Sequence, residues 1–182
     1  MTPGPFDIDA AIRRVPDHPR AGILFYDLLP LFQDREGLAS AVGRITGWGR
    51  ERAVDRVVGI EARGFVLGGA IATGLGVGLS VARKRGKLPS DRVSREYELE
   101  YGTDVLEMHT DAVARGERVL VHDDLLATGG TALAVCRLVE ELGGVVAGVA
   151  VVAELTFLPG RETLTGYDVM SLVTYASEAV EA

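Results

Sequence analysis

The sequence has a single cysteine, Cys136, among 182 residues, and none of its apolar runs is long enough to cross a bilayer. A lone cysteine excludes an internal disulfide, and a membrane-spanning helix needs about 20 consecutive apolar residues. The N-terminal residues also lack the charged and apolar pattern of a secretion signal. These absences predict a cytoplasmic protein without a membrane partner, in which Cys136 is a core residue.

Positive charge is also scarce. Lys and Arg number 19 against 26 Asp and Glu, which gives a net charge of −7 and an isoelectric point near 5.0. A nucleic-acid binder draws much of its affinity from excess Lys and Arg that neutralise phosphates, so nucleic acid is not an expected partner. Linkers, repeats and low-complexity stretches are missing as well, so residues 1–182 are expected to form a single domain.

Apolar runs alternate with helical patterns along the chain. The β-rich runs are residues 56–60, 77–82, 119–122 and 145–155. They are almost continuously apolar, which is typical of strands that are covered on both faces. Residues 64–75 and 131–142 have the periodicity of helices. The alternation predicts an α/β fold with a mainly parallel central sheet flanked by helices.

Two segments break this alternation. Residues 16–35 carry three prolines and a short apolar run, which predicts an irregular flap with a small strand. Residues 83–110 begin as a basic loop and continue with enough alternation for a hairpin or long β-arm around Gly102. Long excursions from a compact α/β domain are often functional.

The stretch VLVHDDLLATGGTA, residues 119–132, has the strongest functional signal. Asp123 and Asp124 follow a predicted strand, at the edge where open α/β sheets bind their ligands. Two ionised carboxylates can accept both hydroxyl hydrogens of a vicinal diol.

The turn after this acid pair predicts a phosphate site. It can offer several backbone N–H groups and two hydroxyls to an anion at the start of a helix. Its residues are Ala127, Thr128, Gly129, Gly130 and Thr131. No G-x-x-x-x-G-K-[ST] loop occurs, so a nucleoside triphosphate is not indicated. A diol site next to a monophosphate site predicts a ribose 5-phosphate ligand.

These residues carry a family resemblance. VLVHDDLLATGGTA resembles the phosphoribosyl pyrophosphate motif of the type I phosphoribosyltransferases, and the ATGGT ending resembles the adenine phosphoribosyltransferases in particular. Further matching motifs are PDHPRAGILFYDLLPLF (16–32), GIEARGF (59–65), RKRGKLP (83–89) and LEYGTDVLEMHTDA (99–112). The resemblance implies the type I phosphoribosyltransferase fold, a base-covering flap and a β-arm lid. It also implies a purine-salvage reaction that converts adenine and phosphoribosyl pyrophosphate to AMP and pyrophosphate.

The resemblance also assigns the pyrophosphate site. The matching residues are Glu61, Ala62, Arg63, Arg83, Lys84 and Lys87, with Arg63 also counted as catalytic. Arg83 would reach the pyrophosphate of the neighbouring subunit, which implies a homodimer. A cis peptide is expected between Glu61 and Ala62. Mg²⁺ would be held mainly by substrate and water, without a direct protein ligand.

Base binding is assigned by resemblance to Leu24, Phe25, Tyr26 and Leu126. Phe25 would stack on the purine, and backbone groups of Leu24 and Tyr26 would contact its exocyclic amine. Tyr26 is a departure, because the family commonly has Arg or Lys there. Specificity for a 6-oxopurine on the same scaffold is therefore an alternative.

Glu100, in the LEYG motif, is the predicted residue for handling the adenine proton. A second alternative is a regulator that binds phosphoribosyl pyrophosphate without catalysis. Such regulators usually add a DNA-binding domain, for which the residues before the flap leave no room. His122 stands where the family often has an apolar residue, and it is expected to be a neutral core histidine rather than a metal ligand.

Overall fold

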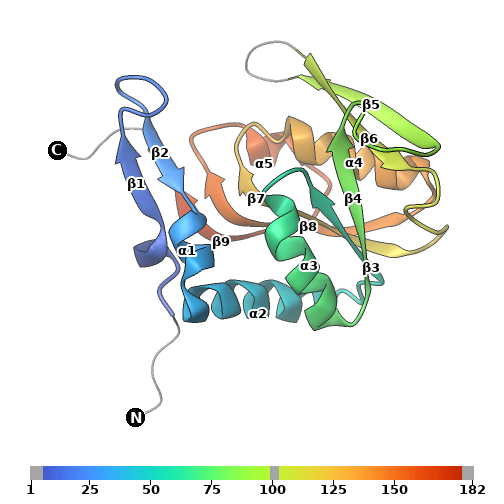
Figure 1. The fold of residues 1–182 in the computed structure, drawn as a ribbon, viewed down its shortest axis with the longest axis horizontal. Coiled ribbons are helices and arrows are strands. Elements are labelled where there is room, and N and C mark those ends of the chain that lie inside the picture. The colour runs from blue at the N-terminus through green and yellow to red at the C-terminus, as the bar shows by residue number, and fades with distance from the viewer. Residues whose placement is uncertain (1–5, 99–102, 178–182) are drawn as a thin grey trace.

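The predicted strands lie in one seven-stranded sheet of the computed structural model, which describes residues 6–98 and 103–177 (Figure 1). The strands are β3 (Arg56–Ile60), β4 (Gly78–Lys84), β5 (Arg92–Glu98), β6 (Thr103–His109), β7 (Arg118–Leu126), β8 (Val145–Leu155) and β9 (Val169–Tyr175). Their order across the sheet is β5-β6-β4-β3-β7-β8-β9. Neighbours from β4 to β9 pair in parallel, whereas β5 and β6 join antiparallel. The prediction of a mainly parallel sheet is confirmed.

Helices cover both faces of this sheet. α2 (Arg35–Glu51) and α3 (Gly64–Leu75) lie on one face, and α4 (Gly130–Glu141) lies on the other (Figure 1). Successive strand residues point to opposite faces. Val57 accordingly packs in the core beneath α2 and α3, and Val58 packs in the core beneath α4. No helix among residues 6–98 and 103–177 is long and apolar enough to span a membrane.

The flap is more regular than the sequence predicts. β1 (Arg13–Pro16) and β2 (Leu24–Asp27) form an antiparallel hairpin, and the short helix α1 (Leu29–Gln33) follows them. A 3-10 turn at Asp9–Ala11 precedes the hairpin. The predicted single strand is thus one half of a two-stranded sheet that is separate from the main sheet.

The predicted β-arm is present as β5 and β6, which pair from Arg92 opposite His109 to Glu98 opposite Thr103. The turn around Gly102 lies outside the described residues. The arm is also a part of the main sheet, because β6 pairs with the end of β4 through Arg83 and Lys84.

The sequence patterns did not indicate α2, although it is a helix of 17 residues. Asp34 caps its start by accepting a hydrogen bond from the backbone N–H of Gly37 at 2.7 Å. The buried stripe of the helix includes Gly37 and Gly49, and glycine has low helix propensity. A Cβ at Gly49 would lie only 3.2 Å from a methyl group of Leu75 on α3, so close helix packing requires the glycine.

The acid pair lies inside a strand, not after one as predicted. β7 continues to Leu126, because β8 still pairs with Asp123 and Leu125. On its other side β7 pairs with β3 only as far as His122. From Asp123 onward, that edge of β7 faces the turn after β3 instead of a strand. The sheet therefore opens a space beside the acid pair.

His122 is fully buried, and its Nδ1 lies 2.8 Å from the carbonyl oxygen of Ala150. Its Nε2 has no hydrogen-bond partner among the described residues. Burial lowers the pKa of His122 to about 4, so the ring is neutral at pH 7, as the sequence predicts.

We expect His122 to make the free energy of unfolding depend on pH. The unfolded histidine has a pKa near 6.5 and the folded one a pKa of about 4, so stability is lost as pH falls through this interval. The loss attributable to His122 reaches about 3 kcal/mol below the folded pKa. Urea unfolding at several pH values between 4 and 7 would measure it.

The variant His122→Val should weaken this pH dependence, because valine cannot bind the proton. The exposed His18 offers a control, and His18→Asn should leave the slope as in the wild type. The same slope in His122→Val and the wild type would contradict the assignment.

Candidate active site

The acid pair, Asp123 and Asp124, is the electrostatic centre of the site. The side chain of Asp124 is almost fully buried, and its backbone N–H donates to Asp123 Oδ1 at 2.9 Å. Arg63 Nε lies 2.8 Å from Asp124 Oδ2, yet that oxygen has no well-aligned hydrogen bond among the described residues. The contact is a charge pair that another donor can replace.

Burial raises the pKa of both carboxyl groups. The rise is larger for Asp123, where the negative charge of Asp124 adds to the effect of burial, whereas Arg63 opposes the rise at Asp124. When both are ionised, this buried and this partly buried carboxylate, with Arg63 paired to Asp124 alone, hold a surplus of negative charge. Hydroxyl donors or a cation would relieve it.

Gly64 lets the start of α3 lie against the acid pair. A Cβ on Gly64 would be 2.9 Å from the carbonyl oxygen of His122 and 3.1 Å from Asp123 Oδ1. Any other residue would push α3 away from β7. The glycine of the EARGF motif thus fixes the distance between the Arg63 turn and the carboxylates.

The predicted phosphate turn, residues 127–131, forms a loop between β7 and α4. A cavity of about 80 Å³ joins it to the acid pair. The lining is Asp123, Leu125, Leu126, Ala127, Thr128, Gly129, Thr131 and Ala132. Gly129 has φ +82° and caps the start of α4. The structure therefore brings the predicted diol and phosphate residues together.

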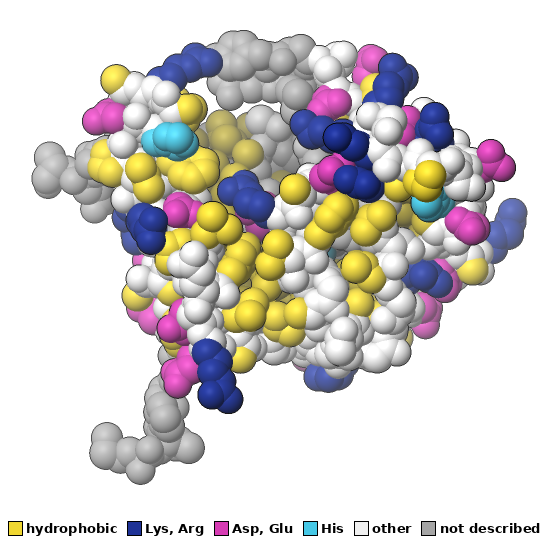
Figure 2. All heavy atoms as spheres, in the orientation of Figure 1, with side chains coloured by type: hydrophobic (Ala, Val, Ile, Leu, Met, Phe, Trp, Pro, Cys, Tyr) yellow, Lys and Arg dark blue, Asp and Glu magenta, His cyan; other side chains and the backbone are white. Residues whose placement is uncertain are grey.

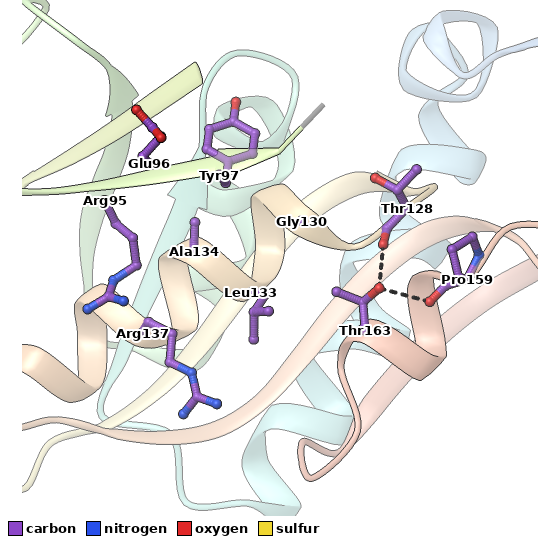
Figure 3. A pocket seen from close by; sticks show the side chains of 10 residues that line it. All are labelled: Arg95, Glu96, Tyr97, Thr128, Gly130, Leu133, Ala134, Arg137, Pro159 and Thr163. Carbon is purple, nitrogen blue, oxygen red and sulfur yellow. Dashed lines mark hydrogen bonds between the residues drawn. The ribbon is translucent and has the colours of Figure 1, made fainter. Parts of the chain in front are cut away.

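The short helix α5 (Gly160–Thr163), which sequence reasoning missed, supports this loop from behind. Thr163 Oγ1 lies 2.7 Å from the carbonyl oxygen of Thr128 and 3.0 Å from that of Pro159 (Figure 3). A Cβ on Gly129 would lie 2.7 Å from the carbonyl oxygen of Gly160. Only the Pro-Gly turn at residues 159–160 could have hinted at this support.

Tyr97 on β5 contacts the opposite end of the loop. It lines one cavity together with Thr128 and Gly130, and its hydroxyl donates to Asp104 Oδ2 at 3.5 Å. Burial raises the pKa of Tyr97. The β-arm thus reaches the phosphate loop through a residue that the sequence patterns did not single out.

The GIEARGF turn and the basic loop are tied together within the chain. The peptide between Glu61 and Ala62 is cis, as the resemblance implied. Arg83 Nη2 lies 2.8 Å from Glu61 Oε1, and the backbone N–H of Lys84 donates to Glu61 Oε2 at 3.0 Å. The Arg83 guanidinium lowers the pKa of Glu61. Glu61 therefore holds the basic loop against the turn that carries Arg63.

The remaining predicted cations lie along the same loop. The ammonium group of Lys84 is 3.0 Å from Asp104 Oδ2. Lys87 is exposed, and its carbonyl oxygen accepts from Arg83 Nη1 at 3.1 Å.

A larger cavity of about 330 Å³ lies under the flap. We call it the flap cavity, and it is lined by Pro19, Arg20, Ile23, Leu24, Phe25, Tyr26, Arg63, Leu125, Ala127, Leu155, Phe157 and Leu158. The imidazole of His18 packs edge-on against the Phe25 ring at 5.0 Å between centroids. Arg63 thus borders both this cavity and the acid pair.

One of the predicted base residues lies elsewhere. Leu125, not Leu126, lines the flap cavity, because adjacent strand residues alternate and Leu126 points into the core and the smaller cavity. Tyr26 lines the flap cavity as predicted, and its ring stacks on Tyr175 at 3.7 Å. Glu100, the predicted proton-handling residue, lies outside the described residues.

A further cavity of about 610 Å³ lies between the β-arm, α4 and α5 (Figure 3). It shares Thr128 and Gly130 with the phosphate loop. Its two arginines already have partners, because Arg95 pairs with Glu141 at 3.2 Å and Arg137 pairs with Glu140 at 2.8 Å. The cavity holds neither carboxylate of the acid pair, so its size alone does not mark it as the reaction site.

Comparison with known proteins places the chain in a family. Residues 32–164 match the model of the phosphoribosyl transferase domain. The adenine phosphoribosyltransferase of Solibacter usitatus is 52% identical over 169 residues, which cover 93% of this chain and 98% of that protein. The solved structure of the Thermoanaerobacter pseudethanolicus adenine phosphoribosyltransferase has a TM-score of 0.88 at 48% identity, covering 92% and 98% of the two chains.

A more distant solved structure has the same fold. The Saccharomyces cerevisiae adenine phosphoribosyltransferase is 37% identical, with a TM-score of 0.86 and coverage of 91% of this chain and 96% of that one. The chain therefore belongs to the phosphoribosyl transferase family, among the adenine phosphoribosyltransferases.

Proposed function

We propose that this chain transfers the 5-phosphoribosyl group from phosphoribosyl pyrophosphate to adenine, giving AMP and pyrophosphate. One observation carries the proposal: the phosphate loop, the acid pair and the flap cavity adjoin one another. The two cavities share Leu125 and Ala127 in their walls, and Arg63, which lines the flap cavity, lies 2.8 Å from Asp124. A phosphate, a ribose and a base in that order match this arrangement.

The relatives support the same reaction. The curated proteins at 52% and 54% identity are named adenine phosphoribosyltransferases. The Saccharomyces cerevisiae structure was determined in complex with adenine and an imino-altritol bisphosphate. The 6-oxopurine alternative depends on Tyr26 altering the base site; the curated relatives named for adenine favour adenine over it.

Each group of residues has a role that follows from its chemistry. Asp123 and Asp124 accept the ribose hydroxyls, and the loop N–H groups bind the 5-phosphate. The C1′–oxygen bond to pyrophosphate breaks while the bond from C1′ to adenine N9 forms, so cations must stabilise the departing anion. Arg63 is positioned for this role, since a ribose that occupies Asp124 frees its guanidinium.

The remaining roles follow the family resemblance. Lys84 and Lys87 add positive charge along the pyrophosphate, and Glu61 with Ala62 forms the turn that faces it. Phe25 and Leu125 hold the base between them, and the backbone of Leu24 and Tyr26 contacts its amine. Glu100 accepts the proton that adenine releases.

Mg²⁺ fits the residues that are present, provided that the substrate carries it. No group of three or more His, Cys, Asp or Glu side chains that could hold a metal occurs in residues 6–98 and 103–177. The acid pair supplies hard oxygen atoms and surplus negative charge beside the ribose site. Bound Mg²⁺ would neutralise charge on the pyrophosphate, with ligands mainly from substrate and water.

A homodimer in the cytoplasm completes the proposal. Val66 on α3 and Leu79 on β4 are large apolar side chains that are 54% and 39% exposed. They belong to neighbouring elements, because the Leu79 side chain lies beside Gly68 and Gly69 of α3. Figure 2 shows hydrophobic side chains gathered over the middle of this face. Covering this face with a second copy would place the basic loop near the partner's site, where Arg83 would act.

The reaction is tested by pyrophosphate release with phosphoribosyl pyrophosphate, Mg²⁺ and one purine at a time. We expect turnover with adenine, and with hypoxanthine and guanine a kcat/KM lower by about 100-fold or more, because backbone groups that match an amine are left unpaired by an oxo group. Turnover with a 6-oxopurine would overturn the base assignment. Binding of phosphoribosyl pyrophosphate without turnover of any purine would favour the regulator.

The acid pair is tested by Asp123→Asn and Asp124→Asn, which keep the shape and remove the charge. Hydrogen bonds to charged groups contribute roughly 1.5 to 3 kcal/mol, so each change should lower kcat/KM for phosphoribosyl pyrophosphate by about ten- to a hundredfold. Asp111 is exposed in a turn, so Asp111→Asn serves as the control. An unchanged value in either site variant would remove that carboxylate from the ribose site.

The dimer is tested by Val66→Asp, which puts a charge on the apolar face. Light scattering should give twice the chain mass of 19.3 kDa for the wild type and a lower mass for the variant. Activity should fall with the mass, because Arg83 acts across the interface. Val145 is similarly exposed, at 47%, and Val145→Asp should change neither property. A fully active wild-type monomer would contradict the proposal.

A further inference from the structure

The two faces of the flap hairpin carry different side chains and make different contacts. Arg14 on β1 stands directly opposite Tyr26 on β2, and Val15 stands opposite Phe25. Since successive strand residues point to opposite faces, Arg14 and Tyr26 share one face and Phe25 belongs to the other. Phe25 and Tyr26 both line the flap cavity, and the Tyr26 ring also stacks on Tyr175.

The face with Arg14 and Tyr26 is fixed to the C-terminal end of β9. The rings of Tyr26 and Tyr175 are stacked at 3.7 Å and 14°, and both residues are buried. The Tyr26 hydroxyl donates to the carbonyl oxygen of Ser177 at 3.1 Å. Arg14 lies 5.6 Å from the centre of the Tyr175 ring, so both hairpin strands contact this tyrosine.

Asp9 joins Tyr175 and Arg14 through its carboxylate. The hydroxyl of Tyr175 donates to Asp9 Oδ1 at 2.7 Å, and Arg14 Nη2 donates to the two oxygens of the same carboxylate at 2.9 and 2.8 Å. These hydrogen bonds lower the pKa of Asp9 against the effect of its burial. We call Asp9, Arg14, Tyr26 and Tyr175 the flap anchor.

The hairpin depends on such an attachment for its position. It forms a separate two-stranded sheet and pairs with no strand of the seven-stranded sheet. An isolated two-stranded hairpin is at best marginally stable in water. Side-chain contacts must therefore set where Phe25 lies over the flap cavity.

We propose that Tyr26 is a positioning residue for the base: through its stack on Tyr175, it holds Phe25 over the flap cavity. The inference rests on the proposed function for its effect on adenine, and on the geometry alone for its effect on the hairpin. Tyr26 sets the affinity for the base without contacting the ribose or the pyrophosphate. Loss of the stack should therefore affect adenine and spare phosphoribosyl pyrophosphate.

The test measures the KM of each substrate in Tyr26→Leu, Tyr175→Leu and Tyr26→Phe. We expect the two leucine variants to raise the KM of adenine by about tenfold and to leave that of phosphoribosyl pyrophosphate within about twofold. Tyr26→Phe keeps the stacked ring and should restore an adenine KM close to that of the wild type. Tyr167→Leu, a tyrosine outside the flap anchor, controls for general loss of stability.

A double variant sharpens the result. Because the stack is already lost in either single variant, Tyr26→Leu with Tyr175→Leu should raise the adenine KM no more than Tyr175→Leu alone, which also removes the contacts of Tyr175 with Asp9 and Arg14. An unchanged adenine KM in the leucine variants, equal rises for both substrates, or additive effects would overturn the inference.

Hydrogen exchange of the β1 and β2 amides tests the anchoring of the hairpin independently of the reaction. Tyr26→Leu should speed exchange in residues 13–27 relative to the wild type, and Tyr167→Leu should not. If the wild type does not turn over adenine, the proposed function fails while this measurement still decides the anchoring. Unchanged exchange in Tyr26→Leu would refute the anchor even in an active enzyme.

Discussion

Two adjacent carboxylates, one buried and one partly buried, are the constraint on which the rest of the site depends. Asp123 and Asp124 repel each other, and burial makes the repulsion costly, as the raised pKa of each carboxyl group records. One cation, Arg63, faces them, and Gly64 is required because a side chain there would collide with the carbonyl of His122. The surrounding protein leaves the negative charge incompletely compensated. Hydroxyl donors and a hydrated cation are the groups that could compensate it, which is why we propose a sugar substrate that arrives with Mg²⁺.

The phosphate end and the base end of the site are built differently. Gly129 and Thr128 hold the phosphate loop against α5, so its shape is set by the close approach of two backbone segments. A loop that is fixed before binding loses little entropy when the phosphate arrives. The base end depends on a hairpin outside the main sheet, held by side-chain contacts to Tyr175. In the proposed function, affinity for the phosphoribosyl group therefore depends on the sheet, whereas affinity for the base depends on the flap.

The hydrophobic periodicity of the sequence predicted those strands and helices whose pattern is contained in their own residues. The apolar runs at 56–60 and 145–155 coincide with β3 and β8, and the helical pattern at 64–75 coincides with α3. Helix α2 was not predicted because glycines occupy its buried stripe, where Gly49 lies against Leu75 of α3 and Gly37 lies against Leu31 of α1. β7 is longer than predicted because its final residues pair with β8, and the sequence does not show which strands pair. Both misses arise from contacts between distant segments.

The same division applies to the site. The acid pair and the phosphate loop are contiguous in the sequence, so their residue types and spacing were enough to predict that they lie together, and the ribose 5-phosphate site stays a prediction. Leu125 lines the flap cavity in place of the predicted Leu126, because the strand continues past the acid pair and decides which leucine faces the cavity. Tyr26 is the clearest case of a role that depends on a distant partner. Its position in the flap motif suggested altered chemistry at the base, yet its ring stacks on Tyr175, which lies far along the chain. A substitution in a binding motif can therefore act on the support of a site while the contacting surface stays the same.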